Sequence, residues 1–256
     1  MPHSIKTLLL ALALASCATQ SQAPQETASA ADPAANAAAA LADARRPEED
    51  RARDALRHPA EMLAFANIGP GARVADLLPG GGYFTRIFAV AVGPEGRVYP
   101  IIRPDGVSGQ YETPILAVAA QYPNAVMARE NFNTMTFPEP LDVFFTAQNY
   151  HDLHIARYNL GSIADVNRAV FNALKPGGLY VIIDHTSQAG TEHTVVETLH
   201  RIDPAVVRRE VEAAGFVYDG ESNVLDNPAD PLTANVFDPA IRGHTDQFAM
   251  RFRKPE

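Results

Sequence analysis

The chain has 256 residues, of which 46% are hydrophobic and 20% are charged, with a single cysteine. This composition excludes a polar disordered chain, a collagen-like chain and a disulfide-rich scaffold. The 21 Lys and Arg residues against 30 Asp and Glu residues give a formal net charge of −9. The electrostatic field of a negatively charged protein does not attract nucleic acid or anionic lipid, so we expect no nucleic-acid partner.

The first 17 residues predict an export signal. Lys6 gives a short basic region, residues 8–14 are apolar, and small residues precede Cys17. The segment resembles a bacterial lipoprotein signal with its lipobox, which implies cleavage before Cys17, lipid attachment to that thiol and a membrane anchor in the cell envelope. By the same resemblance, Ala18 after the cysteine favours the outer membrane, facing the periplasm. An ordinary secretory signal with an incidental cysteine is the alternative. Because Cys17 is the only cysteine, no intramolecular disulfide and no Cys-based zinc cage can form.

Residues 18–44 are low in complexity, since 13 of these 27 residues are Ala and none is aromatic. Such a stretch cannot bury enough apolar surface to offset its ordering entropy, although the run at residues 37–40 can form transient helix. We therefore expect a disordered tether over residues 18–44 and a folded domain over residues 45–256.

Short apolar runs bounded by Gly and Pro predict buried strands in this domain. The runs are residues 73–78, 98–102, 125–128, 141–146, 179–183, 216–220 and 247–252. Helix signals lie between them: Pro47 followed by acids, Ser162 with Asp165, and the cap Asp203 before a helix that ends at Gly215. The first of these helices should stop before Pro59, and a short helix should follow over residues 60–67. Together they predict an α/β fold with an open, doubly wound, mostly parallel sheet and helices on both faces.

Two loops of this fold carry the functional signal. In the first, a strand ends in Asp76 and continues through Gly80, Gly81 and Gly82 into a helix. Glycines there let a ligand approach the backbone and the helix N-terminus, and a carboxylate at the strand end can hold an ammonium or a ribose hydroxyl. Such a turn can also serve packing alone. The second loop is Leu-Lys-Pro-Gly-Gly at residues 174–178, just before a buried strand.

In this order, the two loops resemble those of the class I S-adenosylmethionine-dependent methyltransferases, over residues 50–254. The resemblance implies a seven-stranded sheet of order 3-2-1-4-5-7-6 with the last-placed strand antiparallel, and S-adenosylmethionine as the cofactor. It also implies cofactor-binding residues: Asp76, Gly80 and Gly82 at the methionine end, Asn131 near adenine, and Gln148 and Asn149 beside the sulfonium. A nicotinamide-binding Rossmann fold is the competing interpretation, but the third glycine of its fingerprint is absent after Gly82.

Some positions depart from the family pattern or have two interpretations. Leu78 stands where the family has its first loop glycine. Ile102 stands where the family has an acid for the ribose, and Asp105 is the nearest replacement. Tyr83, which we include among the cofactor-binding candidates, can present its ring to a cation or cap the core.

Polar residues after the later strands are candidates for substrate handling. We select His185, His200, Arg242 and Asp246, with His185 as the general base because imidazole titrates in the useful range. The long segment 222–246 predicts a lid. Asp203 is explained as a helix cap and is left out.

The segment after the fourth strand contains possible metal ligands. His151 and His154 could share a metal with Asp152, but solvated or capping histidines are commoner, so we expect no metal.

The sequence thus predicts an exported lipoprotein that transfers a methyl group from S-adenosylmethionine to a small, lipid-associated or envelope-associated acceptor. Two alternatives remain open. One is a repurposed domain that binds or transforms another envelope metabolite in the same cleft, and the other is a tethered binding module without enzymatic activity.

Overall fold

The computed structural model describes residues 1–2, 33–104 and 109–256. The predicted export signal with Cys17, and Asp105, lie outside the described residues. By its contacts the chain divides at Ala30, and the unit Ala31–Glu256 contains the fold described below. Its longer helices are α1 (Pro33–Ala42), α5 (Tyr83–Val92), α6 (Gly109–Gln121), α7 (Ile163–Ala173) and α9 (Pro204–Ala213); the shorter ones are α2 (Glu48–Arg51), α3 (Asp54–Arg57), α4 (Pro59–Phe65), α8 (Val196–Leu199) and the 3₁₀ helices η1 (His151–His154) and η2 (Ala156–Tyr158).

One seven-stranded sheet runs through this unit in the order β3-β2-β1-β4-β5-β7-β6. Its strands are β1 (Arg73–Leu77), β2 (Arg97–Ile102), β3 (Ala128–Arg129), β4 (Leu141–Ala147), β5 (Leu174–His185), β6 (Val217–Ser222) and β7 (Gln247–Arg253). The first five strands pair in parallel, and β7 runs antiparallel to both of its neighbours. The predicted fold class and strand order are therefore confirmed.

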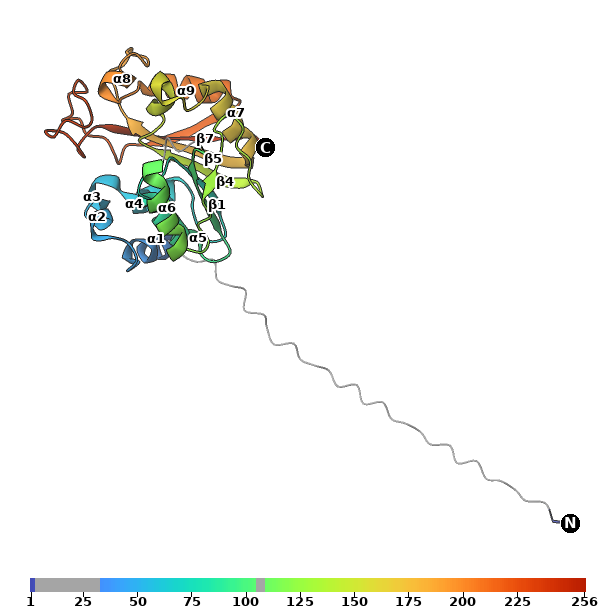
Figure 1. Ribbon diagram of the computed structural model, residues 1–256. Coiled ribbons are helices and arrows are strands. Elements are labelled where there is room, and N and C mark those ends of the chain that lie inside the picture. Colours follow the sequence, from blue (N-terminus) through green and yellow to red (C-terminus); the bar gives the residue numbers. More distant parts are fainter. Residues whose placement is uncertain (3–32, 105–108) are drawn as a thin grey trace. The chain divides into compact units, whose positions relative to one another are not determined.

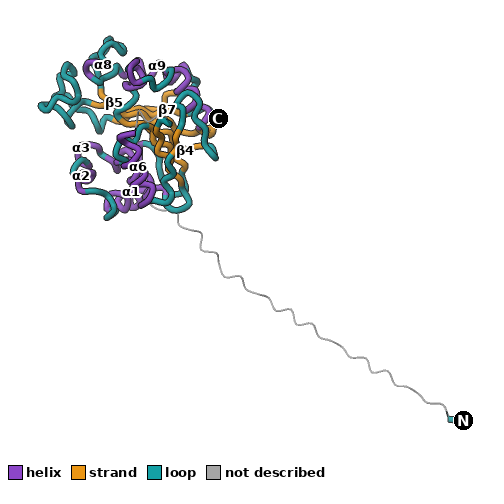
Figure 2. The backbone as a smooth tube through the Cα atoms, in the orientation of Figure 1, coloured by secondary structure: helices purple, strands orange, loops and turns teal. Residues whose placement is uncertain are grey.

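Helices cover both faces of the sheet, with α1, α4, α5 and α6 on one side and α7, α8 and α9 on the other (Figures 1 and 2). Alternation along the central strands supplies apolar side chains to both layers. Val74 and Phe145 belong to the core on the α5 side, whereas Ala75 and Phe144 belong to the core on the α7 side. Among the described helices, none has both the length and the apolar character needed to cross a bilayer.

The structure corrects the predicted tether over its last part. Residues 33–42 form α1, which packs against α5 and α4. Ala37 and Ala40 are buried, and Asn36 Nδ2 donates a hydrogen bond of 2.7 Å to the carbonyl oxygen of Ala91 in α5. Alanine side chains are short, so this helix can lie close to α5, and Leu41 adds one large apolar side chain against the same core. The folded unit therefore begins one helix earlier than predicted.

The helix starts behave partly as predicted. Asp203 caps α9 by accepting a hydrogen bond of 2.9 Å from the backbone N–H of Ala205, which confirms its assignment as a cap. Ser162 is the N-cap of α7, but its side chain makes no capping hydrogen bond. The helix predicted after Pro47 is split into α2 and α3, and the left-handed backbone of His58 ends α3 before α4 begins.

Candidate functional site

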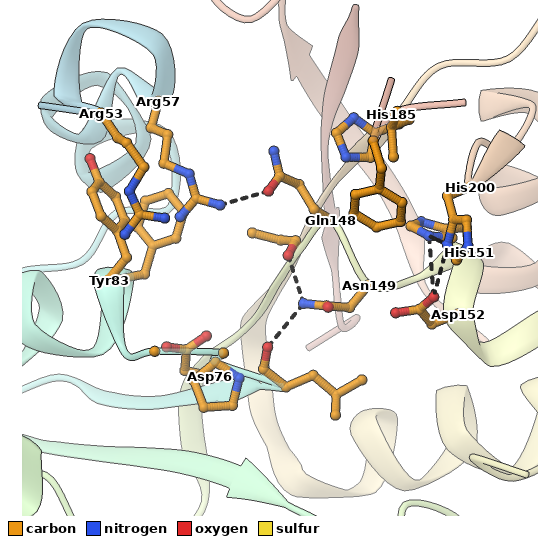
Figure 3. A pocket seen from close by; sticks show the side chains of 18 of the residues that line it. Arg53, Arg57, Asp76, Tyr83, Gln148, Asn149, His151, Asp152, His185 and His200 are labelled. Carbon is orange, nitrogen blue, oxygen red and sulfur yellow. Dashed lines mark hydrogen bonds and ion pairs between the residues drawn. The ribbon is translucent and has the colours of Figure 1, made fainter. Parts of the chain in front are cut away.

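A cavity of about 410 Å³ opens at the carboxyl ends of β1, β4 and β5 (Figure 3). Ligands in open α/β sheets bind at this edge. One end of the cavity is formed by the loop after β1 and by side chains from α3, and the other end is formed by histidines and an acid from η1, β5 and the residue after α8. This cavity is referred to below as the pocket.

The glycine loop forms the first end of the pocket. Gly80 has a φ of 56°, and a Cβ built on it meets nothing within 4 Å, so a ligand can approach the backbone here. Gly81 also lines the pocket. Gly82 is predicted to line the cofactor but is not part of the pocket wall. A Cβ built on it would lie 2.8 Å from the Val118 side chain of α6. Its role in this structure is close helix packing.

Leu78 keeps the backbone conformation expected of a glycine. Its φ is 52°, in the left-handed region, and its side chain lines the pocket. The loop is held by its backbone, since the Leu78 N–H donates to the carbonyl oxygen of Ile101 (3.1 Å). Asn149 Nδ2 donates to the carbonyl oxygen of Leu78 (3.0 Å) and to that of Ala147 (2.6 Å). Asn149 also lines the pocket, and its two hydrogen bonds fix the loop.

Asp76 is a buried carboxyl at the end of β1. It is 3% exposed, lines the pocket, and accepts a hydrogen bond of 2.6 Å from the Thr85 hydroxyl of α5. Burial raises the pKa of Asp76 to about 7, although the Thr85 hydroxyl and the charge of Arg57 act in the opposite direction. A cation placed in the pocket would favour the ionised form.

Arg57 enters the pocket from α3, opposite the glycine loop. Its Nη2 donates a hydrogen bond of 2.6 Å to Gln148 Oε1 (Figure 3). Gln148 Nε2 donates to Gln247 Oε1 at 2.9 Å. Burial lowers the pKa of Arg57 to about 10, which leaves it positively charged at physiological pH. Gln148 has a φ of 63°, in the left-handed region, so its backbone is strained.

The ring of Tyr83 already faces cations of its own chain. The guanidinium carbons of Arg57 and Arg53 lie 4.6 Å and 5.0 Å from the ring centroid. The Tyr83 hydroxyl donates a hydrogen bond of 2.6 Å to Asp54 of α3. Tyr83 lines the pocket, and in this structure it holds the arginine-bearing helices over the glycine loop.

Asp184 anchors the other end of the pocket. Fully buried at the end of β5, it accepts hydrogen bonds from the backbone N–H of His151 (2.7 Å), from His151 Nδ1 (2.8 Å) and from the backbone N–H of His185 (2.8 Å). Burial by itself would lower the pKa of His151, but the charges of Asp184 and Asp152 raise it to about 10.

His185 and His200 both line the pocket, as predicted. His185 Nδ1 lies 2.8 Å from the Thr245 hydroxyl, and burial lowers the pKa of His185 to about 3, so its ring is neutral at physiological pH. His200 follows α8 with a φ of 53°, and its ring lies edge-on to that of Phe237, with the centroids 4.9 Å apart.

Besides Gly82, three predicted site residues are not in the pocket wall. Asn131 is exposed and accepts a hydrogen bond from the backbone of Asn133 at 3.1 Å, as in a local turn. Arg242 is exposed, with its guanidinium 6.0 Å from the ring centroid of Phe237. Asp246 accepts a hydrogen bond of 2.6 Å from the backbone of Asn227 and so ties two parts of one loop together.

Arg53 and Arg57 are the pocket residues that sequence reasoning overlooked. They are four residues apart on the segment predicted as the first helix, a spacing that places them on one side of it. That spacing could have indicated a common target, but nothing in the sequence shows that this helix faces the glycine loop. Val236 and Phe237, which also line the pocket, lie in a segment without any motif.

The sequence matches no protein-family model and no curated protein. Solved structures do match. A SAM-dependent methyltransferase from Aquifex aeolicus has a TM-score of 0.57 and 17% identity, with 87% of this chain and 98% of that chain covered. The [4+2]-cyclase SpnF has a TM-score of 0.59 and 15% identity, with 83% and 84% covered. A possible exported protein from Bordetella parapertussis has a TM-score of 0.52 and 18% identity, with 80% and 68% covered.

At these identities the likeness concerns the fold. The strand order and the structural neighbours agree, and the chain therefore has the Rossmann-like α/β fold of the class I methyltransferases.

Proposed function

We propose that this protein is an S-adenosylmethionine-dependent methyltransferase that acts on a small or envelope-associated acceptor. One observation carries the proposal: a single pocket joins the open glycine loop and the buried Asp76 to a separate cluster of polar side chains. Methyl transfer needs two binding regions that meet, one for the methyl donor and one for the acceptor. The pocket offers both.

The first end of the pocket suits the amino-acid part of the cofactor. Asp76 can hold the ammonium group, and Arg57 can hold the carboxylate. The space over Gly80 lets the ligand lie against the backbone. When bound, S-adenosylmethionine would supply a methyl group carried on a sulfonium sulfur. The chain's part is to fix the position of this group relative to the acceptor.

The second end of the pocket suits a small acceptor. Phe237 gives apolar surface beside His200, and Tyr158 and Leu160 also line the pocket. A pocket of about 410 Å³ lies in the range of ordinary small-molecule sites. The neutral ring of His185 can accept a hydrogen bond from an acceptor hydroxyl or amine. Because burial lowers the pKa of His185 to about 3, the ring is a weak base, and its part in this proposal is to orient the acceptor. Arg242 and Asp246 have no part in this proposal, because neither lines the pocket.

A repurposed pocket is the second candidate, and the adenosine side of the site favours it. Ile102 is buried and offers no hydrogen-bond acceptor to a ribose. Next to it, Arg103 Nη1 donates to the carbonyl oxygens of Tyr158 (2.8 Å) and Asn159 (2.5 Å), so this arginine links the end of β2 to η2. SpnF, a cyclase by its description, has a similar fold. A tethered binding module without catalysis remains the third candidate.

For the location we propose export with a lipid anchor on Cys17, which holds the protein at the periplasmic face of the bacterial outer membrane. The support is the lipobox-like sequence before Cys17. The fold neighbour from Bordetella parapertussis is likewise described as a possible exported protein. A substrate associated with the envelope would be within reach of such an anchored domain.

Calorimetry tests the cofactor part of the proposal. Residues 31–256, which form the compact unit, are titrated with S-adenosylmethionine and with S-adenosylhomocysteine. We expect micromolar binding of both. Asp76→Ala should abolish binding, because the ammonium group loses its carboxylate. Asp165→Ala is the matched control, since Asp165 is an exposed acid of α7 away from the pocket. If the native unit binds neither compound, a repurposed pocket replaces the methyltransferase.

A further inference from the structure

We propose that His151, Asp152 and His200 form a binding site for one divalent transition-metal ion, such as Zn²⁺, at the histidine end of the pocket. Among the described residues, these three bring possible ligand atoms within 4.8 Å of one another. The site does not depend on the methyltransferase activity proposed above. It also differs from the metal set weighed in the sequence, which paired His151 and Asp152 with His154.

In the structure His154 pairs with other residues, and His200 lies beside His151 in its place. His154 Nε2 lies 3.2 Å from Glu210 Oε2, and the His154 ring stacks on that of His193 with centroids 5.1 Å apart. His154 does not line the pocket. His200 is 49 residues beyond His151 in the chain, and the packing of α8 against η1 brings the two rings together.

The distances between the three ligand atoms suit a single ion. His151 Nε2 lies 3.2 Å from His200 Nδ1 and 3.2 Å from Asp152 Oδ1, and His200 Nδ1 lies 3.7 Å from Asp152 Oδ1. Tetrahedral ligands at about 2.1 Å from one zinc ion lie about 3.4 Å apart. The three atoms therefore already stand at the separation that such an ion requires.

A second layer of hydrogen bonds orients the first ligand. His151 Nδ1 donates to Asp184 Oδ1 at 2.8 Å, so Nε2 is the nitrogen that faces His200 and Asp152. Metal-binding histidines usually make this type of bond to a carboxylate. A bound ion would take the place of the proton on Nε2, because histidine binds a metal through a deprotonated nitrogen. Asp184 is itself fixed by the backbone N–H groups of His151 and His185, so its position does not depend on a flexible side chain.

The three side chains are shielded from bulk water but border the cavity. Their exposed fractions are 3% for His151, 21% for Asp152 and 10% for His200, and all three line the pocket. A site with three protein ligands and an open side is typical of catalytic zinc rather than structural zinc. The open side here faces the pocket, so an oxygen of a bound acceptor could complete the coordination.

Two imidazoles with one carboxylate select among metals. This set suits Zn²⁺, Fe²⁺, Ni²⁺ and Cu²⁺, and it disfavours Mg²⁺ and Ca²⁺, which prefer ligands that are all oxygen. The alternative is a hydrogen-bonded chain from Asp184 through His151 to His200 without any metal. That arrangement would bind no divalent ion, which makes the two interpretations separable.

The test is a titration of residues 31–256 with ZnCl₂ after dialysis against a chelator. We expect one ion per chain by calorimetry, and with CoCl₂ a visible absorption band of a low-symmetry, nitrogen-ligated cobalt site. His200→Ala and Asp152→Asn should each weaken Zn²⁺ binding at least 100-fold. Asp184→Asn should weaken it about 10- to 100-fold, because Asp184 orients a ligand without contacting the ion.

His154→Ala is the matched control and should bind Zn²⁺ as the native chain does, since its histidine lies in the same short helix η1 but outside the pocket. Far-ultraviolet circular dichroism of each variant checks that it is folded. No binding by the native chain, or equal loss in His154→Ala, would overturn the metal site in favour of the hydrogen-bonded chain. Titration with S-adenosylmethionine is read separately, so failure of one proposal leaves the other intact.

Discussion

Backbone strain at three non-glycine residues coincides with the pocket. Leu78, Gln148 and His200 all have positive φ values and all line the cavity. Each such conformation costs on the order of 1 kcal/mol or more and persists only when the surroundings hold it. Here Asn149 holds Leu78, Arg57 contacts Gln148, and Phe237 packs on His200. Strain concentrated in this way is typical of a functional site.

The buried carboxyl of Asp76 makes the stability of the unliganded chain depend on pH. Its pKa rises from an ordinary 3.8 to about 7 because it is buried, with only Thr85 and Arg57 acting against burial. The folded chain therefore holds this proton to higher pH than the unfolded chain does. The resulting stability is fully present below about pH 4 and is lost as the pH rises through 7.

Asp76→Asn removes this dependence because the amide does not titrate. Between pH 4 and pH 8 the free energy of unfolding of the native chain should fall relative to that of Asp76→Asn, by up to about 4 kcal/mol. Urea denaturation of both proteins at several pH values measures the difference, in which the other titrating groups cancel. A constant difference across this range would show that Asp76 is ionised in the fold at all of these pH values.

Helix α1 shows what an alanine-rich element can contribute to the fold. Ala37 and Ala40 are buried against the layer that contains α5, and the carbonyl oxygen of Leu41 accepts a hydrogen bond of 2.8 Å from the buried Arg46. Arg46 in turn pairs with Asp54 of α3. The helix therefore supports the segment that carries Arg57 into the pocket.

Deletion of residues 18–42 should lower the free energy of unfolding by about 2 kcal/mol, because it exposes the apolar surface that α1 covers. Deletion of residues 18–30 is the control and should change stability little, since that sequence has few apolar side chains to bury. Urea denaturation compares the two truncations. Equal stability of both would mean that α1 contributes nothing to the fold.

At the scale of the whole molecule, the pocket is assembled from distant parts of the chain. Asp76, Gln148, His185 and His200 come from separate segments, and Phe237 comes from the long loop before β7. Parallel strands bring their carboxyl ends to one edge of the sheet, and this explains why the residues that follow β1, β4 and β5 meet there. The loop predicted as a lid contributes Val236 and Phe237 to the pocket wall.

The lipid anchor proposed on Cys17 concerns the whole molecule, because it would determine which substrates the pocket meets. Cys17→Ser removes the thiol that the predicted lipobox presents. In a Gram-negative host we expect the native protein in the membrane fraction and Cys17→Ser in the soluble periplasmic fraction or retained as the uncleaved precursor. Metabolic labelling with a fatty acid should mark the native protein alone. Labelling of the variant would place the lipid elsewhere.

Local patterns in the sequence were sufficient for the framework of the fold. Apolar runs between turn residues predicted the strands, and the loops at Asp76 and at residues 174–178 indicated the strand order through a family resemblance. Of the predicted site residues, Asp76, Gly80, Tyr83, Gln148, Asn149, His185 and His200 line the pocket, while their roles in binding and catalysis stay predictions. Each of these residues lies at or just after the end of a strand, or at the boundary of a helix. The edge of the sheet or the adjoining helix therefore fixes its place.

Only the tertiary structure decided the remaining contacts. Arg57 reaches the pocket because α3 lies over the glycine loop, and Gly82 leaves the pocket wall because α6 packs against it. His200, rather than His154, joins His151 because α8 packs on η1. Helix periodicity and strand alternation are local properties that a sequence records directly. Which elements pack together depends on contacts between residues far apart in the chain, and a single sequence does not record those.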